Sequence, residues 1–208
     1  MINFFSHLHS RRLRIRNFLE IGSRDGEDAN TFAKAAGIRQ VHVIEPAPQS
    51  FARIQAHFPF FQVYNLALSN RNGHQVFHNI VDPDLNKQGM SSLMPREIYE
   101  RFPSENILVE LMRGDTFLDK YGIQDISACK IDVEGHAVEV LEGFGTELTR
   151  IHAIHLECET VPVWEGQRLF GEAKALLEGR GFQMVSYWEY NQPTTQCDSI
   201  WLLAHNRA

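Results

Sequence analysis

Several features that would point to other classes of protein are scarce or missing in this sequence. Only three of the 208 residues are cysteines, and Cys129, Cys158 and Cys197 lie far apart. Neither a disulfide framework nor a zinc site is therefore indicated. No apolar run approaches the roughly 18 residues of a membrane span, and the first residues lack the apolar core of a signal peptide. We expect a cytoplasmic protein with no membrane partner.

Positive charge is also scarce. The formal net charge is −6 at pH 7, whereas a nucleic-acid surface needs a concentrated positive field. Arg11, Arg12, Arg14 and Arg16 form a short basic run, but such a run is more typical of a solvated face than of a binding arm. We therefore expect no nucleic-acid partner. The sequence leaves the oligomeric state open.

What the sequence does contain is a series of short apolar runs that alternate with helical patterns. Helices are predicted over 29–36, 48–57, 137–141 and 165–178. Short helical crossovers between strands imply parallel pairing, whereas the last two runs predict an antiparallel terminal hairpin. The predicted strands are 17–21, 40–45, 61–65, 73–80, 107–112, 126–133, 151–157, 182–187 and 199–204.

Residues 81–102 are different, because they are rich in Asp, Asn, Pro and Ser. They predict a long loop with at most a short helix at 95–101, and a loop of this length is usually functional or mobile. Ser91, Ser92 and Leu93 are candidates to close over a ligand. With 43% hydrophobic residues, the chain fits one ordinary domain. We predict a single domain over 1–208 with 81–102 as an insertion that acts as a lid.

The first chemical signal is FLEIGSRDG, residues 18–26. Glu20 lies inside a predicted strand, and Gly22 and Gly26 frame a turn in which the backbone can approach a ligand. Glu45 ends the next predicted strand, a position from which an acidic side chain in a βαβ nucleotide fold binds ribose hydroxyls. Strand, glycine turn, helix, strand and Glu in this order predict a nucleoside cofactor.

The turn lacks the Gly-x-Gly-x-x-Gly pattern that seats a pyrophosphate on a helix N-terminus. Ser23, Arg24 and Asp25 fill the interval, and an aspartate at the start of a helix repels a diphosphate. Acidic groups suit S-adenosylmethionine, whose sulfonium and α-amino groups are positive and which has no phosphate. An NAD-dependent reductase is therefore disfavoured.

The second signal is KIDVEGHAVEVLEG, residues 130–143, in which a strand pattern gives way to a helix. Parallel sheets bind ligands at the carboxyl ends of their strands, so Asp132 and Glu134 are expected to face the cleft. The alternatives are a hydrogen bond to the turn backbone for Asp132 and a favourable helix-dipole contact for Glu134. His136 is a third candidate for a catalytic base, although lone histidines are more often structural.

Carboxylates also cluster in the next predicted strand. His155, Glu157 and Glu159 alternate along it and so share one side. Asp132 and Glu157 are expected to meet across the cleft, where they would bind Mg²⁺ or the hydroxyls of a substrate. A divalent metal is the less favoured of these two options, and we assign no metal ligand.

With FLEIGSRDG, VIEPAPQSF, NLALSNRNG, SSL and KIDVEGHAVEVLEGF in this order, the chain resembles FkbM-family S-adenosylmethionine-dependent methyltransferases. The resemblance implies a three-layer α/β Rossmann-like fold, with a mostly parallel seven-stranded sheet and an antiparallel C-terminal strand. It also implies S-adenosylmethionine as cofactor, with the glycine turn at its methionine part, the acid after strand two at the ribose and residues after strand three at the adenine. The implied cofactor positions are Glu20, Gly22, Ser23, Arg24, Asp25, Gly26, Glu45, Pro46, Ala67, Leu68 and Asp132.

The resemblance further implies transfer of a methyl group to a hydroxyl of a sugar or polyketide-like small molecule. Such an in-line displacement needs alignment of the reactants and a base, which contributes roughly 10²- to 10⁴-fold. Asp132, Glu134 and His136 are the candidate catalytic residues. Arg24 departs from the small polar residue that is usual in the family turn. N- or C-methylation with the same cofactor and a non-catalytic binding module remain as alternatives.

Overall fold

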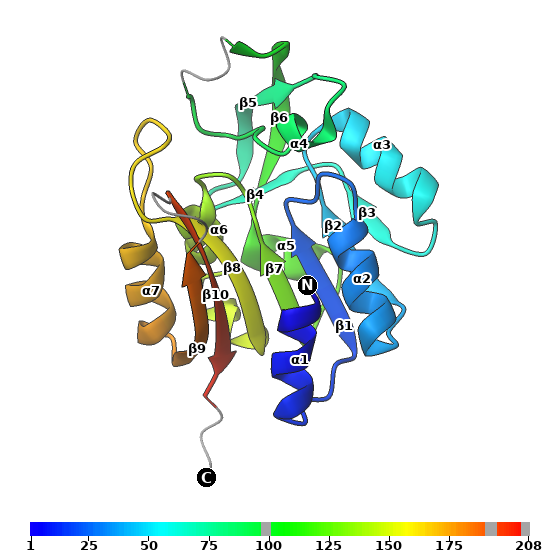
Figure 1. The fold of residues 1–208 in the computed structure, drawn as a ribbon, viewed down its shortest axis with the longest axis vertical. Coiled ribbons are helices and arrows are strands. Elements are labelled where there is room, and N and C mark those ends of the chain that lie inside the picture. Colours follow the sequence, from blue (N-terminus) through cyan, green and yellow to red (C-terminus); the bar gives the residue numbers. More distant parts are fainter. Residues whose placement is uncertain (97–100, 190–194, 205–208) are drawn as a thin grey trace.

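A seven-stranded sheet forms the centre of the computed structural model, which describes residues 1–96, 101–189 and 195–204 (Figure 1). Its strands are β1 (Asn17–Ile21), β2 (Gln40–Ile44), β3 (Gln62–Tyr64), β7 (Ala128–Ile131), β8 (Ala153–Glu159), β9 (Phe182–Glu189) and β10 (Gln196–Leu203). They lie in the order β3-β2-β1-β7-β8-β10-β9. The pairs from β3 to β8 are parallel, and β10 is antiparallel to both of its neighbours. The predicted sheet, with its antiparallel C-terminal strand, is confirmed.

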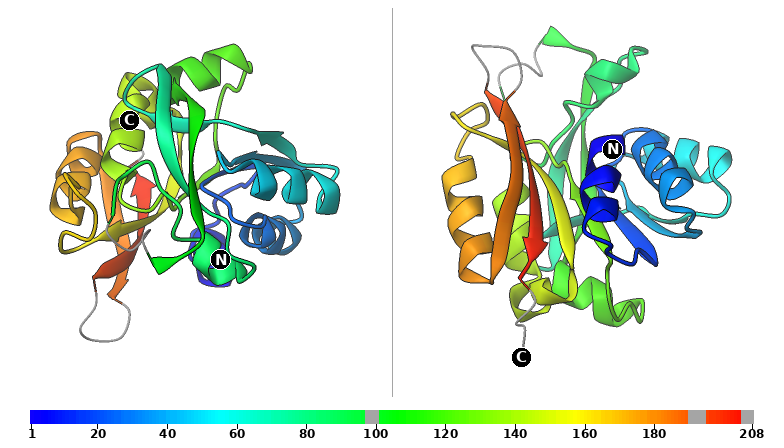
Figure 2. Two further views of the ribbon diagram at one scale, coloured as in Figure 1. Left: turned by 90° about the horizontal axis from the view of Figure 1, so that it is seen from above. Right: turned by 60° about the horizontal axis from the view of Figure 1, so that its bottom comes forward.

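Helices cover both faces of this sheet and make a three-layer α/β fold (Figures 1 and 2). One face carries α1 (Ile2–Ser10), α2 (Glu27–Ala36) and α3 (Pro48–His57); the other carries α5 (Gly114–Lys120), α6 (Ala137–Gly143), α7 (Phe170–Gly179) and a 3₁₀ helix (Gly145–Arg150). Each face has its own apolar cluster. Among the described residues, no helix has the length and apolar character that crossing a bilayer would require.

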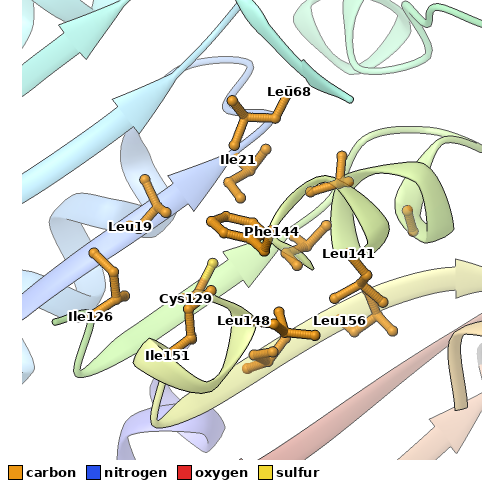
Figure 3. Packing of buried hydrophobic residues seen from close by; sticks show 14 of the residues in the cluster. Leu19, Ile21, Leu68, Ile126, Cys129, Leu141, Phe144, Leu148, Ile151 and Leu156 are labelled. Carbon is orange, nitrogen blue, oxygen red and sulfur yellow. The ribbon is translucent and has the colours of Figure 1, made fainter. Parts of the chain in front are cut away.

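All five residues of the strand β1 are buried, because helices cover both faces of the sheet. Leu19 and Ile21 pack with Cys129 and Phe144 on the face that carries α6 (Figure 3). Phe18 points to the opposite face, where its ring stacks 4.4 Å from that of Phe32. Full burial of side chains of this size contributes roughly 1.5–3 kcal/mol each. The strands that carry the site are thereby held rigidly from both sides.

A second, three-stranded sheet was not predicted. It consists of β4 (Ala67–Ser69), β6 (Ser104–Arg113) and β5 (Gly73–Ile80), in that order. Figure 1 places it at the end of the molecule toward which β1 points. The predicted loop 81–102 contains a short helix, α4 (Leu85–Gln88), and joins β5 through a bridge between His78 and Ser92. The helix expected at 95–101 and the connection within the predicted terminal hairpin lie partly outside the described residues.

Two further differences concern helices. The helix α1 was missed, because its buried residues Phe4 and Leu8 make only one short apolar face. The helix expected from 165 begins instead at Phe170. The apolar pattern extends further back, but the side-chain oxygen of Gln167 accepts hydrogen bonds from the backbone of Val163 and Trp164, at 2.8 and 3.2 Å. These bonds stabilise a turn where a helix was expected.

Candidate active site

A cavity of about 360 Å³ lies at the carboxyl ends of β1, β2 and β7. The strand order changes direction at β1, which has β2 on one side and β7 on the other, and ligands bind at such switch points in open α/β sheets. Ile21 is in register with Ile44 and with Ile131. The three strands therefore end at the same height in the sheet. Glu45, which follows β2, and Asp132, which follows β7, both line the cavity.

The two glycines of the first turn are needed for packing within the protein. Gly22 has φ +80°, and a Cβ there would lie 1.8 Å from the carbonyl oxygen of Asp132. Gly26 has φ +79°, and a Cβ there would lie 2.9 Å from the ring of Phe58. We expected glycine to make room for a ligand, whereas the space at each Cβ position is taken by the protein itself. Gly22 lines the cavity together with Ser23, whereas Gly26, also a predicted cofactor position, is not among the residues that line it.

Ser23 links the acidic residues of the first two strands. Its hydroxyl donates to Glu20 Oε2 at 2.5 Å, and its backbone N–H donates to Glu45 Oε2 at 3.0 Å. The other carboxylate oxygen of Glu45 accepts from the backbone N–H of Ala47 at 2.7 Å. The glycine turn and the end of β2 are thus held together by side chains that face the cavity.

Burial dominates the electrostatics of these two glutamates. It raises the pKa of Glu20 to about 7, against the opposing charge of Lys130. It also raises the pKa of Glu45 to about 7, against the opposing hydrogen bonds from Ala47 and Ser23. A buried carboxylate costs free energy unless it gains hydrogen bonds or a counter-charge. A ligand with hydroxyl donors and positive groups would supply both.

Arg24 and Asp25 form an ion pair at the rim of the cavity, with Arg24 Nη2 2.9 Å from Asp25 Oδ2. The other oxygen of Asp25 accepts from the backbone N–H of Glu27 at 3.1 Å, in the first turn of α2. Asp25 therefore supports the start of the helix. The side chain of Arg24 is engaged by its neighbour, and contact with a cofactor carboxylate stays a prediction.

The remaining predicted cofactor positions form the other wall. Pro46, Ala67 and Leu68 all line the cavity, and Ala67 and Leu68 belong to β4 of the second sheet. The side-chain amide of Asn65 donates to the carbonyls of Glu45 and Pro46, at 3.0 and 2.9 Å. This contact fixes the chain after β2 beside β4. The wall is apolar, as an adenine ring would need.

Asp132 and Glu134 follow β7 and both line the cavity. The backbone N–H of Asp132 donates to Ile21 at 3.0 Å, and its Oδ2 lies 3.0 Å from Lys130 Nζ. Glu134 has φ +48°, and its carbonyl accepts from the Ser92 hydroxyl at 2.5 Å. The helix α6 begins at Ala137, so Glu134 precedes its first turn, and the helix-dipole alternative for Glu134 stays a prediction.

His136 is the least suitable of the three candidate bases. It is buried, and its Nε2 lies 3.0 Å from the Ser69 hydroxyl. Its Nδ1 has no hydrogen-bond partner within the described ranges and lies 3.8 Å from Glu139 Oε2. Burial lowers the pKa of His136 to about 4. The ring is neutral at pH 7 and has little affinity for a proton.

Three carboxylates meet at the far end of the cavity. One oxygen from each of Asp132, Glu134 and Glu157 lies within 4.8 Å of the others, which confirms the predicted approach of Asp132 and Glu157. Burial, and then the charges of Asp132 and Glu134, raise the pKa of Glu157 to about 11. Burial, and then Asp132, raise the pKa of Glu134 well above its usual range. Burial and the neighbouring carboxylates thus favour the protonated forms of Glu134 and Glu157.

Sequence reasoning assigned no role to Lys130, which lines the cavity beneath Asp132. The alternation of a strand places Lys130 and Asp132, two residues apart, on one side, and this signal was available in KIDVEG. The loop 81–102 also contributes, because Gln88, Gly89, Met90, Ser91 and Leu93 line the cavity. Leu93 is buried in a small cluster with Phe77 and Val109. Closure of this loop as a lid stays a prediction.

Comparisons with known proteins agree with this geometry. A family model described as methyltransferase FkbM domain matches residues 20–184. The 2-O-methyltransferase NoeI of Sinorhizobium fredii (strain NBRC 101917 / NGR234) is 28% identical over 159 residues, and the match covers 72% of this chain and 65% of that protein. The chain thus spans less than two thirds of this relative.

Two solved structures show the same fold. Methyltransferase FkbM from Methylobacillus flagellatus KT superposes with a TM-score of 0.56 at 11% identity, over 91% of this chain and 44% of that one. The 1,6-didemethyltoxoflavin-N1-methyltransferase of Burkholderia thailandensis, solved with bound 1,6-didemethyltoxoflavin and S-adenosylhomocysteine, superposes with a TM-score of 0.53 at 12% identity, over 97% and 77%.

Proposed function

Because this chain belongs to the FkbM methyltransferase family, we propose that it transfers a methyl group from S-adenosylmethionine to a hydroxyl oxygen of a small molecule. The observation that carries the proposal is the shared cavity of Glu45 and Asp132. Glu45 has the position of a residue that binds the ribose, and Asp132 has the position of a residue at the reacting centre. A cytoplasmic location, expected from the cysteine content, stays a prediction.

The cofactor is S-adenosylmethionine, and the cavity supplies a group for each of its parts. Glu45 accepts hydrogen bonds from the ribose hydroxyls, and the apolar wall of Ala67 and Leu68 flanks the adenine. The methionine part lies along the glycine turn, where Glu20 attracts its ammonium. The negative charge around the cavity favours the sulfonium and disfavours a diphosphate, which argues against a dinucleotide.

The reaction is an in-line displacement. The acceptor oxygen forms a bond to the methyl carbon while the carbon–sulfur bond breaks. The electron pair of the broken bond stays on sulfur, which gives S-adenosylhomocysteine. The hydroxyl proton passes to Asp132. Alignment of oxygen, carbon and sulfur supplies much of the rate enhancement, and the base adds roughly 10²- to 10⁴-fold.

Two observations support oxygen as the methylated atom. The relative NoeI is named as a 2-O-methyltransferase. In addition, Asp132 can accept a proton that a hydroxyl must lose during transfer, whereas the neighbouring acids Glu134 and Glu157 can bind the other hydroxyls of a polyol. The acceptor is therefore a hydroxyl compound of the sugar or polyketide type.

The test combines binding with turnover. Calorimetry should show that S-adenosylhomocysteine binds and that NADH does not. S-adenosylmethionine with a labelled methyl group should then pass its label to a member of a panel of neutral hexoses and phenolic polyketides. Binding of NADH alone would refute the cofactor assignment. Label transfer only to amines of a matched panel would refute the oxygen acceptor, and cofactor binding without any transfer would favour a non-catalytic module.

A further inference from the structure

Lys130 lies in the middle of β7 and is only 8% exposed. Its neighbours in register are Glu20 on β1 and His155 on β8. An ammonium group in such a place is costly unless carboxylates surround it. Glu20, Lys130 and His155 therefore form a buried polar row across three neighbouring strands of the sheet. Their position calls for a functional explanation.

Three carboxylates contact the ammonium of Lys130. Its Nζ donates a hydrogen bond to Asp28 Oδ2 at 2.6 Å and lies 3.0 Å from Asp132 Oδ2 and 3.9 Å from Glu20 Oε1. Burial works to lower the pKa of Lys130, but the charges of Asp132, Glu20 and Asp28 outweigh burial and hold the pKa well above its usual range. The side chain is therefore charged at neutral pH.

We propose that Lys130 is a positioning residue for methyl transfer, because its ammonium holds Asp132 Oδ2 and so turns the other oxygen, Oδ1, to the acceptor hydroxyl. The inference rests on the proposed function and deepens it. Within the described residues, Asp132 Oδ1 receives no hydrogen bond from another side chain. That oxygen remains available for the proton of the acceptor.

The surroundings of Asp132 explain why a cation is needed there. Glu134 and Glu157 bring their oxygens within 4.8 Å of that of Asp132. Without the charge of Lys130, the carboxylate of Asp132 could turn toward these two acids, whose protonated forms donate hydrogen bonds, and would lose a defined orientation. An alignment error of about 1 Å costs on the order of 10²-fold in rate.

A purely structural role is the main competing explanation. Lys130 also joins α2 to the sheet through Asp28, whose side chain is 48% exposed. If this link were the whole function, removal of Asp28 would have the same effect as removal of Lys130. Asp28 and Asp132, two of the three carboxylates around Lys130, therefore offer a direct comparison.

The experiment measures kcat and KM with the hydroxyl compound that the wild-type enzyme methylates fastest in the panel, together with the Kd of S-adenosylhomocysteine. We expect Lys130→Met to lower kcat by about 10- to 100-fold, with KM and Kd changed by no more than about threefold. Lys130→Arg should recover part of the lost kcat. Asp28→Asn should lower kcat far less than Lys130→Met. Lys174→Met, at a half-exposed lysine on α7, is the matched control and should leave all three constants unchanged.

A double-variant cycle isolates the pathway through Asp132. In an Asp132→Asn background, neither Lys130→Met nor Lys130→Arg should lower kcat further. If Lys130→Met fails to fold, the cycle can still be measured with Lys130→Arg, because arginine retains the positive charge that the buried carboxylates need. An unchanged kcat in Lys130→Met, full additivity with Asp132→Asn, or an equal loss in Asp28→Asn would overturn the inference. A wild-type protein that transfers no label would instead overturn the proposed function.

Discussion

Replacement of Glu45 by alanine tests the placement of the cofactor most directly. In the proposed complex its carboxylate accepts hydrogen bonds from two ribose hydroxyls. Hydrogen bonds to a charged group contribute about 1.5–3 kcal/mol each, so the loss of two costs at least about 3 kcal/mol. Since about 1.4 kcal/mol corresponds to tenfold in affinity, Glu45→Ala should weaken the binding of S-adenosylhomocysteine by roughly 100-fold or more.

The structure also sets the control for this substitution. Glu45 accepts from the backbone N–H groups of Ser23 and Ala47, so alanine removes two supports of the turn as well as the ribose contacts. Glu45→Gln keeps the volume and one acceptor oxygen, and it should weaken binding by only about tenfold. Thermal unfolding of both variants shows how much of the effect is general destabilisation.

Calorimetry with two ligands separates the ribose contacts from the support of the turn. An analogue of S-adenosylhomocysteine that lacks both ribose hydroxyls should bind the wild-type protein and Glu45→Ala with nearly equal affinity. If Glu45→Ala binds the natural ligand as tightly as the wild type, or weakens both ligands by the same factor, the assignment of Glu45 to the ribose is refuted.

Four further predictions follow from the same geometry. Asp132→Asn should lower kcat by about 10²-fold or more while the Kd of S-adenosylhomocysteine stays within about threefold; a loss of binding alone would assign Asp132 to the cofactor. Because the pKa values of Glu20 and Glu45 are raised from 4.5 to about 7 in the folded protein, cofactor affinity in calorimetry should fall as the pH is lowered from 8 to 6. An affinity that does not change with pH would contradict this prediction. The melting temperature of the ligand-free protein should rise as the pH falls from above 7 toward 4.5. Glu20 and Glu45 bind protons more tightly in the folded than in the unfolded protein, so protonation stabilises the folded state. Thorough treatment with EDTA should leave methyl transfer unchanged, and activity restored only by Mg²⁺ would show that the carboxylate cluster holds a metal. Gly22→Ala should destabilise the fold by more than about 3 kcal/mol in chemical denaturation because its Cβ would collide with the Asp132 carbonyl, whereas Gly37→Ala, with φ +66° and open space, should cost only about 1 kcal/mol.

The sequence allowed the central architecture to be predicted because the relevant signals are local. Apolar runs, glycine turns and helical periodicity recur along neighbouring residues, and parallel pairing follows from the crossovers between them. The same local order placed Glu45 and Asp132 at the ends of their strands. Since the carboxyl ends of parallel strands meet at one edge, a shared site for these two residues was predictable without a structure.

Other features depend on contacts between segments that are distant in the chain. The second sheet pairs β4 with β6, and β4 is too short to be distinguished by pattern. The need for glycine at position 22 comes from the carbonyl of Asp132, which follows another strand, β7. No local pattern shows that a backbone carbonyl fills the space where a Cβ would lie.

The sequence by itself therefore determined the fold class, the order of the elements and the residue types available at the rim of the sheet. Only the tertiary structure decided which charges act together. Lys130 lies within 4 Å of Asp28, Asp132 and Glu20 because β7 pairs with β1 and α2 packs beside them. The strength of such interactions depends on distance and burial, and both quantities are set when the strands and helices pack together.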